Sequence, residues 1–240
     1  MANQGVFKVK ELHTPKLRFQ RRLLSGDASS FARLIAKTLH HLRRWPGACI
    51  MRLPLLSPAD LSDDQKTLHA TMREEIRTHF RSFVTEREDG ALEGPWNPWL
   101  HFPDVGTQAW NLSKAVIGMS SIPARCREIA ILVTGRRFAA AYEIYAHTTV
   151  ARIAGLSDRE IGGILAGRRP EKLEPEEFIA FDLALALTDG GPVPEALFLS
   201  AKRVFGDVGC AGLIFLVGLY CFVAVTLNGF DVPVPNEKAE

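Results

Sequence analysis

The sequence predicts an all-α protein. Beyond residue 46, apolar residues recur three and four positions apart, and residues that start or stop helices separate these segments. The alternating pattern of β-strands is nearly absent, and no strand–helix alternation occurs, so a helical bundle is favoured over an α/β fold. With 240 residues, 47% of them hydrophobic, the chain has enough apolar material for one sizeable core.

A basic arm precedes the predicted helical domain. Residues 1–45 contain ten Lys and Arg but only two Asp and Glu, whereas the remainder has a net charge of −6. The turn signal Trp45-Pro46-Gly47 marks the boundary, which gives an extension over 1–45 and a helical domain over 46–240. The arm has the composition of a mitochondrial presequence, and a solvated extension is the alternative. We therefore expect a cytoplasmic protein, or a mitochondrial matrix protein if the arm is a presequence. Nucleic-acid binding is disfavoured, since no aromatic series accompanies the basic residues.

Three helices are predicted in the first half of the domain. A capping box formed by Ser62 and Gln65 opens the first helix, whose apolar stripe is Leu68, Met72, Ile76, Phe80 and Phe83. Residues 85–101 combine turn formers with aromatic residues, so we expect this segment to pack over another part of the protein. Asp104 is a candidate cap for the next helix, which runs through Ala109, Leu112 and Val116. Pro123 suits the first turn of the third helix, which extends to Phe138.

The second half contains a similar series. One helix spans Tyr142 to Ala154 and ends at Gly155, a favoured residue just after a helix. A second capping box, Ser157 with Glu160, opens a short helix that ends at Gly167. Another helix starts at Pro175 and ends before Gly190, and two more follow, over 194–205 and over the uncharged stretch 208–230.

The uncharged stretch allows two interpretations. Its twenty-three residues without a formal charge are long enough to span a bilayer. Asn228, Thr226 and four glycines interrupt it, however, and no basic cluster follows it. We therefore predict a helix buried in a core or subunit interface, and no membrane association.

Glu143 and His147 form the most informative polar pair. Four positions apart on one helix, they lie on the same face, and a carboxylate beside an imidazole can orient it for proton transfer. Glu128 lies one helix earlier, with Arg136 and Arg137 between the two acids. A solvated surface pair is the alternative interpretation. We predict no metal site, because no third His or Cys occurs at ligand spacing, and the scattered cysteines Cys49, Cys126, Cys210 and Cys221 are expected to be free thiols.

The surroundings of these residues resemble a known superfamily. Arg127-Glu128 followed by an apolar run, then Arg136-Arg137, then Tyr142-Glu143 and Tyr145-Ala146-His147, is similar to the core of carboxymuconolactone decarboxylase-like and alkyl hydroperoxidase D-like proteins. Further similar pieces extend the resemblance over residues 51–235, among them Arg52-Leu53-Pro54, Asn97-Pro98-Trp99, Ala154-Gly155-Leu156 and Thr226-Leu227-Asn228. The resemblance implies an orthogonal helical bundle that assembles as a homo-oligomer, a trimer or hexamer in the family.

The resemblance also separates two branches of the superfamily. In the hydroperoxidase branch a CxxC pair lies between the glutamate and the histidine, but those positions here are Ala140 and Glu143. Without the two thiols, a disulfide cycle is impossible. The decarboxylase branch has a Glu-x-x-x-His element similar to Glu143 and His147. This chain departs from that branch at Glu128, where a small hydroxyl residue is usual.

The resemblance thus implies a cofactor-free lyase or isomerase that acts on a small carboxylated lactone or related ring. His147 is expected to donate the proton, Glu143 to hold its tautomer, and Glu128 to act as a second acid–base group or as a partner of an arginine. Arg136 or Arg137 is expected to anchor a substrate carboxylate. His101, Trp99, Tyr142 and Tyr145 are expected to contribute to substrate binding, together with Trp96. The alternatives are a thiol-independent peroxidase or other oxidoreductase on the same fold, and a non-catalytic binding module.

Overall fold

The computed structural model describes residues 51–235, and the basic arm of residues 1–45 with its predicted targeting role lies outside them. Within this range the predicted all-α architecture is confirmed: no strand is present, and the extended backbone is limited to one isolated bridge between Glu86 and Leu92. After the 3₁₀ turn η1 (Pro58–Asp60), the helices are α2 (Asp63–His79), α3 (Trp96–His101), α4 (Pro103–Ile117), α5 (Ala124–Phe138), α6 (Ala141–Ile153), α7 (Asp158–Leu165), α8 (Pro175–Asp189) and α9 (Glu195–Gly229).

Local signals in the sequence begin several of these helices. Both predicted capping boxes form, Ser62 with Gln65 at α2 and Ser157 with Glu160 at α7. Pro175 lies at the start of α8 as expected. The expected cap at Asp104 is wrong, because α4 begins one residue earlier at Pro103 and Asp104 lies in its first turn. There its negative charge still interacts favourably with the helix dipole.

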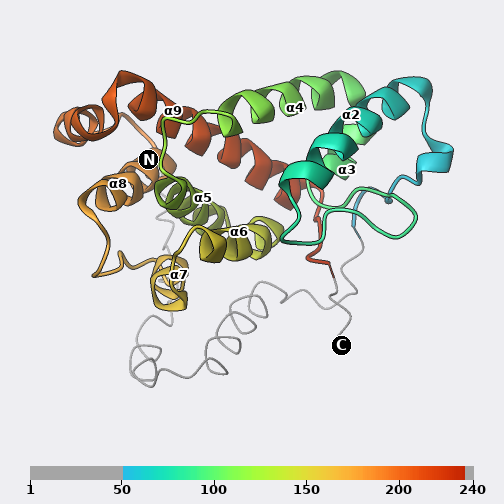
Figure 1. Ribbon diagram of the computed structural model, residues 1–240. Coiled ribbons are helices and arrows are strands. Elements are labelled where there is room, and N and C mark those ends of the chain that lie inside the picture. The colour runs from blue at the N-terminus through green and yellow to red at the C-terminus, as the bar shows by residue number, and fades with distance from the viewer. Residues whose placement is uncertain (1–50, 236–240) are drawn as a thin grey trace, which may run out of the picture. The chain divides into compact units, whose positions relative to one another are not determined.

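Helix α9 is the central element of the bundle. It contacts α4, α5, α6 and α8, and Figure 1 shows it running between α4 on one side and α5 and α6 on the other. Its backbone is not helical at Gly206, where φ is +67°, so the two predicted helices 194–205 and 208–230 exist as segments joined by a kink. Glycine is favoured at this kink because residues with a Cβ are strained at positive φ.

By length and composition, α9 is the one helix in the described range that could cross a membrane. Just over half of its most apolar window, 56%, is buried against the protein. A core helix meets the same criterion, and the contacts of α9 with four other helices are those of a core helix.

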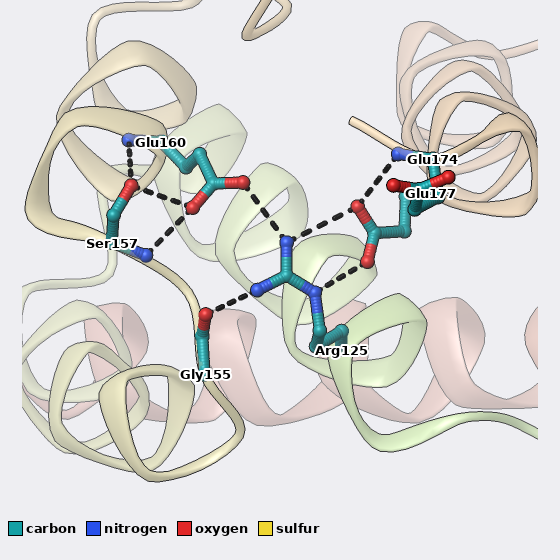
Figure 2. Close-up of polar contacts among 6 residues, drawn as sticks. All are labelled: Arg125, Gly155, Ser157, Glu160, Glu174 and Glu177. Carbon is teal, nitrogen blue, oxygen red and sulfur yellow. Dashed lines mark hydrogen bonds and ion pairs between the residues drawn. The ribbon is translucent and has the colours of Figure 1, made fainter. Parts of the chain in front are cut away.

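Arg125 joins three helices through a cluster of polar contacts (Figure 2). From the first turn of α5, its guanidinium donates hydrogen bonds to Glu160 of α7, at 2.9 Å, to Glu177 of α8 and to the carbonyl of Gly155. Glu177 is almost completely buried, so this network compensates a charge that would otherwise be costly to bury. The cluster fixes the relative positions of α5, α7 and α8.

Candidate active site

A small cavity of about 50 Å³ lies between α9 and the helices α3, α4 and α6. Its wall is almost entirely aromatic and aliphatic, and three polar side chains from α4 and α6 interrupt it, those of Ser113, Glu143 and His147. The remaining lining residues are Phe80, Phe83, Pro95, Trp96, Trp99, Trp110, Ile117, Tyr142, Ala146, Leu219, Tyr220, Val223 and Leu227. The expectation that residues 85–101 pack over another part of the protein is confirmed, because α3 from this segment supplies two tryptophans to the wall.

His147 is held in place by Glu128. Its Nδ1 atom lies 2.8 Å from Oε2 of Glu128 on α5, and both side chains are buried. A carboxylate that accepts a hydrogen bond from Nδ1 fixes the tautomer and leaves Nε2 as the reactive nitrogen. Since His147 lines the cavity and Glu128 does not, the pair presents one imidazole to a bound molecule and keeps its supporting carboxylate behind it.

Glu143 does not orient His147, contrary to the sequence prediction. Both of its carboxyl oxygens are buried without a hydrogen-bond partner in the described residues. Burial raises the pKa of Glu143 well above its usual value, because the charged carboxylate is poorly stabilised away from water, and this favours the protonated carboxyl group. The i,i+4 spacing correctly predicts a shared helix face, but the closer partner of the imidazole comes from the neighbouring helix.

Gly135 makes room for the Glu143 carboxyl group. A Cβ atom at position 135 would lie 2.9 Å from Oε1 of Glu143, closer than side chains normally approach. Gly135 belongs to α5, which also carries Glu128. This helix therefore positions both members of the polar cluster, one by a hydrogen bond and one by close packing.

Tyr220 is a component of the site that the sequence analysis did not identify. Its ring meets the His147 imidazole edge-to-face, with centroids 4.9 Å apart, and restricts rotation of the imidazole from the side of α9. Burial, followed by the nearby Glu128 and Glu143, raises the pKa of Tyr220, so the phenol remains neutral. The one sequence signal for Tyr220 is that it lies in the uncharged stretch 208–230. Every residue of that stretch shares this signal, so it does not single out Tyr220.

Three of the residues expected to bind substrate line the cavity, Trp96, Trp99 and Tyr142. Trp99 stacks on Phe222 with ring centroids 6.2 Å apart. Tyr142 packs its ring over Gly94 and donates a hydrogen bond from its hydroxyl group to the carbonyl of Val84.

The other four predicted binding residues do not line this cavity. His101 is hydrogen-bonded through Nε2 to the carbonyl of Pro54, and Tyr145 accepts a hydrogen bond from the backbone N–H of Val84. Arg137 pairs with Asp189 at 3.3 Å, while the Arg136 guanidinium packs against Gly167. A role for these residues in substrate binding gains no support from their positions.

The described cysteines are free thiols, as expected. Cys126 is fully buried, and burial raises its pKa to about 12. Burial also raises the pKa of Cys210 and Cys221. Since the thiolate is the nucleophile, these raised pKa values disfavour nucleophilic chemistry at the described cysteines. Among residues 51–235, no group of three or more His, Cys, Asp or Glu side chains is arranged to hold a metal ion.

No family model matches the sequence, and no curated protein matches it. Solved structures do. A peroxidase-related protein from Ralstonia eutropha JMP134, described as an alkylhydroperoxidase AhpD core, superposes with a TM-score of 0.63 at 15% identity, over 77% of this chain and 92% of the other. The chain has the AhpD-like fold.

The debrominase Bmp8 is a second structural neighbour on the AhpD-like fold. Its apo form matches with a TM-score of 0.59 at 11% identity, over 79% of this chain and 95% of that one. A cysteine-to-alanine variant of Bmp8 in complex with 2,3,4-tribromopyrrole matches with a TM-score of 0.58 at 12% identity, over 77% and 91%. At these identities the similarity establishes the fold, which confirms the superfamily resemblance at that level.

Proposed function

We propose that the chain is an enzyme that moves a proton on a small ring-shaped substrate, with His147 as the acid–base group. The observation that carries this proposal is the buried contact between Glu128 and Nδ1 of His147, with the imidazole in the wall of an otherwise apolar cavity. A solvated surface pair, the alternative interpretation of the sequence, has neither this burial nor this cavity. General acid–base catalysis by such a group contributes about 10² to 10⁴ in rate.

The reaction class that best suits this arrangement is a lyase or isomerase reaction through an enolate. In a decarboxylation, the bond between the ring carbon and the carboxylate breaks, CO₂ leaves, and the electron pair delocalises towards a ring carbonyl. Protonated His147 then delivers the proton from Nε2 to the carbon, and the Glu128 carboxylate balances the imidazolium charge before this transfer. In an isomerisation, the same nitrogen removes a proton from one carbon and returns it to another.

Glu143 supplies a second proton donor in this scheme. As a neutral carboxylic acid in a dry wall, it can donate a hydrogen bond to a developing enolate oxygen without adding negative charge. Nothing in this scheme depends on a thiol, which agrees with the protonated state of the described cysteines.

The structural neighbours support the proposal that this chain is an enzyme that acts on small molecules. One is described as peroxidase-related, and the other is a debrominase whose structure contains a brominated pyrrole, a small flat ring. Both names belong to those proteins. For this chain they favour small-molecule chemistry over a purely structural module.

The experiment is a proton-exchange screen. The protein is incubated in D₂O with a panel of enolisable carboxylated lactones and cyclic ketones, and NMR follows C–H to C–D exchange and CO₂ release. We expect His147→Ala to lower the rate on any active compound about 10²-fold or more. His79→Ala, which changes an exposed histidine outside the cavity wall, should retain the wild-type rate. A panel without exchange or CO₂ release, or an unimpaired His147→Ala variant, would contradict the proposal, and peroxide turnover without a dithiol would favour the oxidoreductase alternative.

A further inference from the structure

We infer that the indole N–H groups of Trp99 and Trp110 each donate a hydrogen bond to an acceptor atom of the ligand, so that the cavity selects flat rings that carry hydrogen-bond acceptors. The inference deepens the proposed function, since it concerns the same cavity, but it is tested by binding alone. It adds Trp110, which the sequence did not single out, as a residue that determines ligand specificity.

The two indoles share an unusual property. Trp99 of α3 is 4% exposed and Trp110 of α4 is 3% exposed, and both line the cavity. The Nε1 atom of each is buried without a hydrogen-bond partner in the described residues. Buried polar groups are nearly always hydrogen-bonded in native proteins, and an exception points to a water, ion or ligand that completes the site.

Most other polar groups in the wall already have partners. Ser113 donates to the carbonyl of Ala109 within its own helix, and Tyr142 donates to the carbonyl of Val84. His147 uses Nδ1 for Glu128. The two indoles and the Glu143 carboxyl group therefore stand out as polar groups that a bound molecule would satisfy.

The chemistry of an indole fixes what it can bind. Its N–H is a donor only, so its partner must be an acceptor such as a carbonyl, carboxylate or enolate oxygen. The rest of the wall is apolar and largely aromatic, which favours a flat ring. Trp99 also stacks on Phe222, so the direction of its N–H is restricted before any ligand binds.

The Glu143 carboxyl group does not repel a ligand oxygen atom that is bound by the two indoles. Burial raises its pKa and so favours the protonated form, which can act as a third donor. The cavity thus lacks an uncompensated negative charge that would repel an oxygen-rich ligand, because Glu128 is paired with His147.

The test compares two probes of similar size and shape, 4-pyrone, which has a strong carbonyl acceptor, and toluene, which has a methyl group in its place. Ligand-observed NMR titration gives the dissociation constant of each for the intact protein. The readout is the affinity of each protein for 4-pyrone relative to toluene, here called its preference. 4-Pyrone loses more hydration than toluene on entering an apolar cavity, so the change of this preference on removing an N–H, rather than its absolute value, reports the hydrogen bond. Trp99→Phe and Trp110→Phe keep an aromatic ring but remove the N–H, and each should lower this preference about threefold to tenfold while toluene still binds.

Trp96→Phe is the matched control. Trp96 lines the same cavity, but its N–H is not among the buried donors without a partner. Its replacement should change both affinities alike and leave the preference within about twofold of the wild type. Retained toluene binding in each variant shows that the cavity has stayed intact.

The absence of binding by both probes, or an unchanged preference in both Trp99→Phe and Trp110→Phe, would overturn the inference. These outcomes are distinct from failure of the proposed function, which depends on turnover and on His147. A protein that prefers 4-pyrone but shows no exchange or CO₂ release would retain the binding site and lose the catalytic assignment.

Discussion

The Nδ1 atom of His147 lies 2.8 Å from a carboxyl oxygen of Glu128, nineteen positions earlier in the chain and on the adjacent helix. This contact determines which imidazole nitrogen serves the cavity. It also separates the roles of the two glutamates, because Glu128 supports the histidine while the buried carboxyl group of Glu143, whose pKa is raised by burial, has no hydrogen-bond partner in the described residues.

The first prediction concerns the charge of Glu128. Glu128→Gln keeps an oxygen that can accept from Nδ1 but removes the negative charge that balances an imidazolium. We expect kcat on an active compound to fall about 10²-fold, with KM changed less than about threefold. Steady-state kinetics measures both, and Glu128→Asp should recover part of the loss. A fall in affinity alone would assign Glu128 to substrate binding.

Glu143 should make stability decrease with rising pH. Its pKa is raised in the folded protein, so the native state retains a proton that the unfolded chain loses above about pH 4.5. Stability is therefore fully present below that pH and is lost as pH rises towards the folded-state pKa. Glu143→Gln has no such proton, so denaturant unfolding between pH 5 and pH 8 should show the variant gaining stability relative to the wild type. Parallel curves would show that Glu143 ionises normally.

Glu86 should have the opposite dependence. Burial opposes its ionisation, but hydrogen bonds from Arg73 and Arg77 outweigh burial and lower its pKa to about 2. The contribution of ionised Glu86 to the free energy of unfolding is present above about pH 4.5 and is lost as the pH falls towards 2. Unfolding curves between pH 5 and pH 2.5 should therefore fall more steeply for the wild type than for Glu86→Gln. If the two slopes match, the arginine pairs do not stabilise the folded state.

Arg125 should be important for stability but not for chemistry. Arg125→Met leaves Glu177 buried without its cation and should lower the free energy of unfolding by about 3 kcal/mol. Arg159→Met removes a pair whose two side chains are each 85% exposed, and should change it by less than about 0.5 kcal/mol. Chemical denaturation measures the free energy of unfolding of both variants. Equal changes in this free energy would show that the Arg125 network of Figure 2 stabilises the fold no more than an exposed ion pair does.

We propose that a second copy of the chain covers the exposed face of α9 beyond its kink at Gly206, where the exposed large apolar residues are Val208, Phe215, Phe222 and Val225. With Ala211 and Gly218 they are spaced alternately four and three positions apart, the pattern of helices that pair along a seam. The face is uncharged, so two copies meet without like-charge repulsion. Phe215→Asp should reduce the mass measured by light scattering, while Ile153→Asp, an exposed position on α6, should not. A wild-type monomer would contradict the proposal.

Patterns formed by residues close together in the sequence predicted the secondary structure well. Capping boxes at Ser62 and Ser157 and proline at position 175 depend on residues within one helical turn, so they determine helix starts regardless of the rest of the fold. The shared face of Glu143 and His147 followed from helix geometry in the same way. The break at Gly206 separated two helices that the composition had already distinguished.

Such short-range patterns did not predict which residues of different helices are in contact. The choice of Glu128 over Glu143 as the partner of His147, and the approach of Tyr220 and Trp110 to the cavity, depend on how α4, α5, α6 and α9 pack. The same packing left the guanidinium groups of Arg136 and Arg137 out of the cavity wall. Helical periodicity assigns a side chain to a face but does not say what that face meets, because the distance between two helices is set by the shapes of all the side chains packed between them.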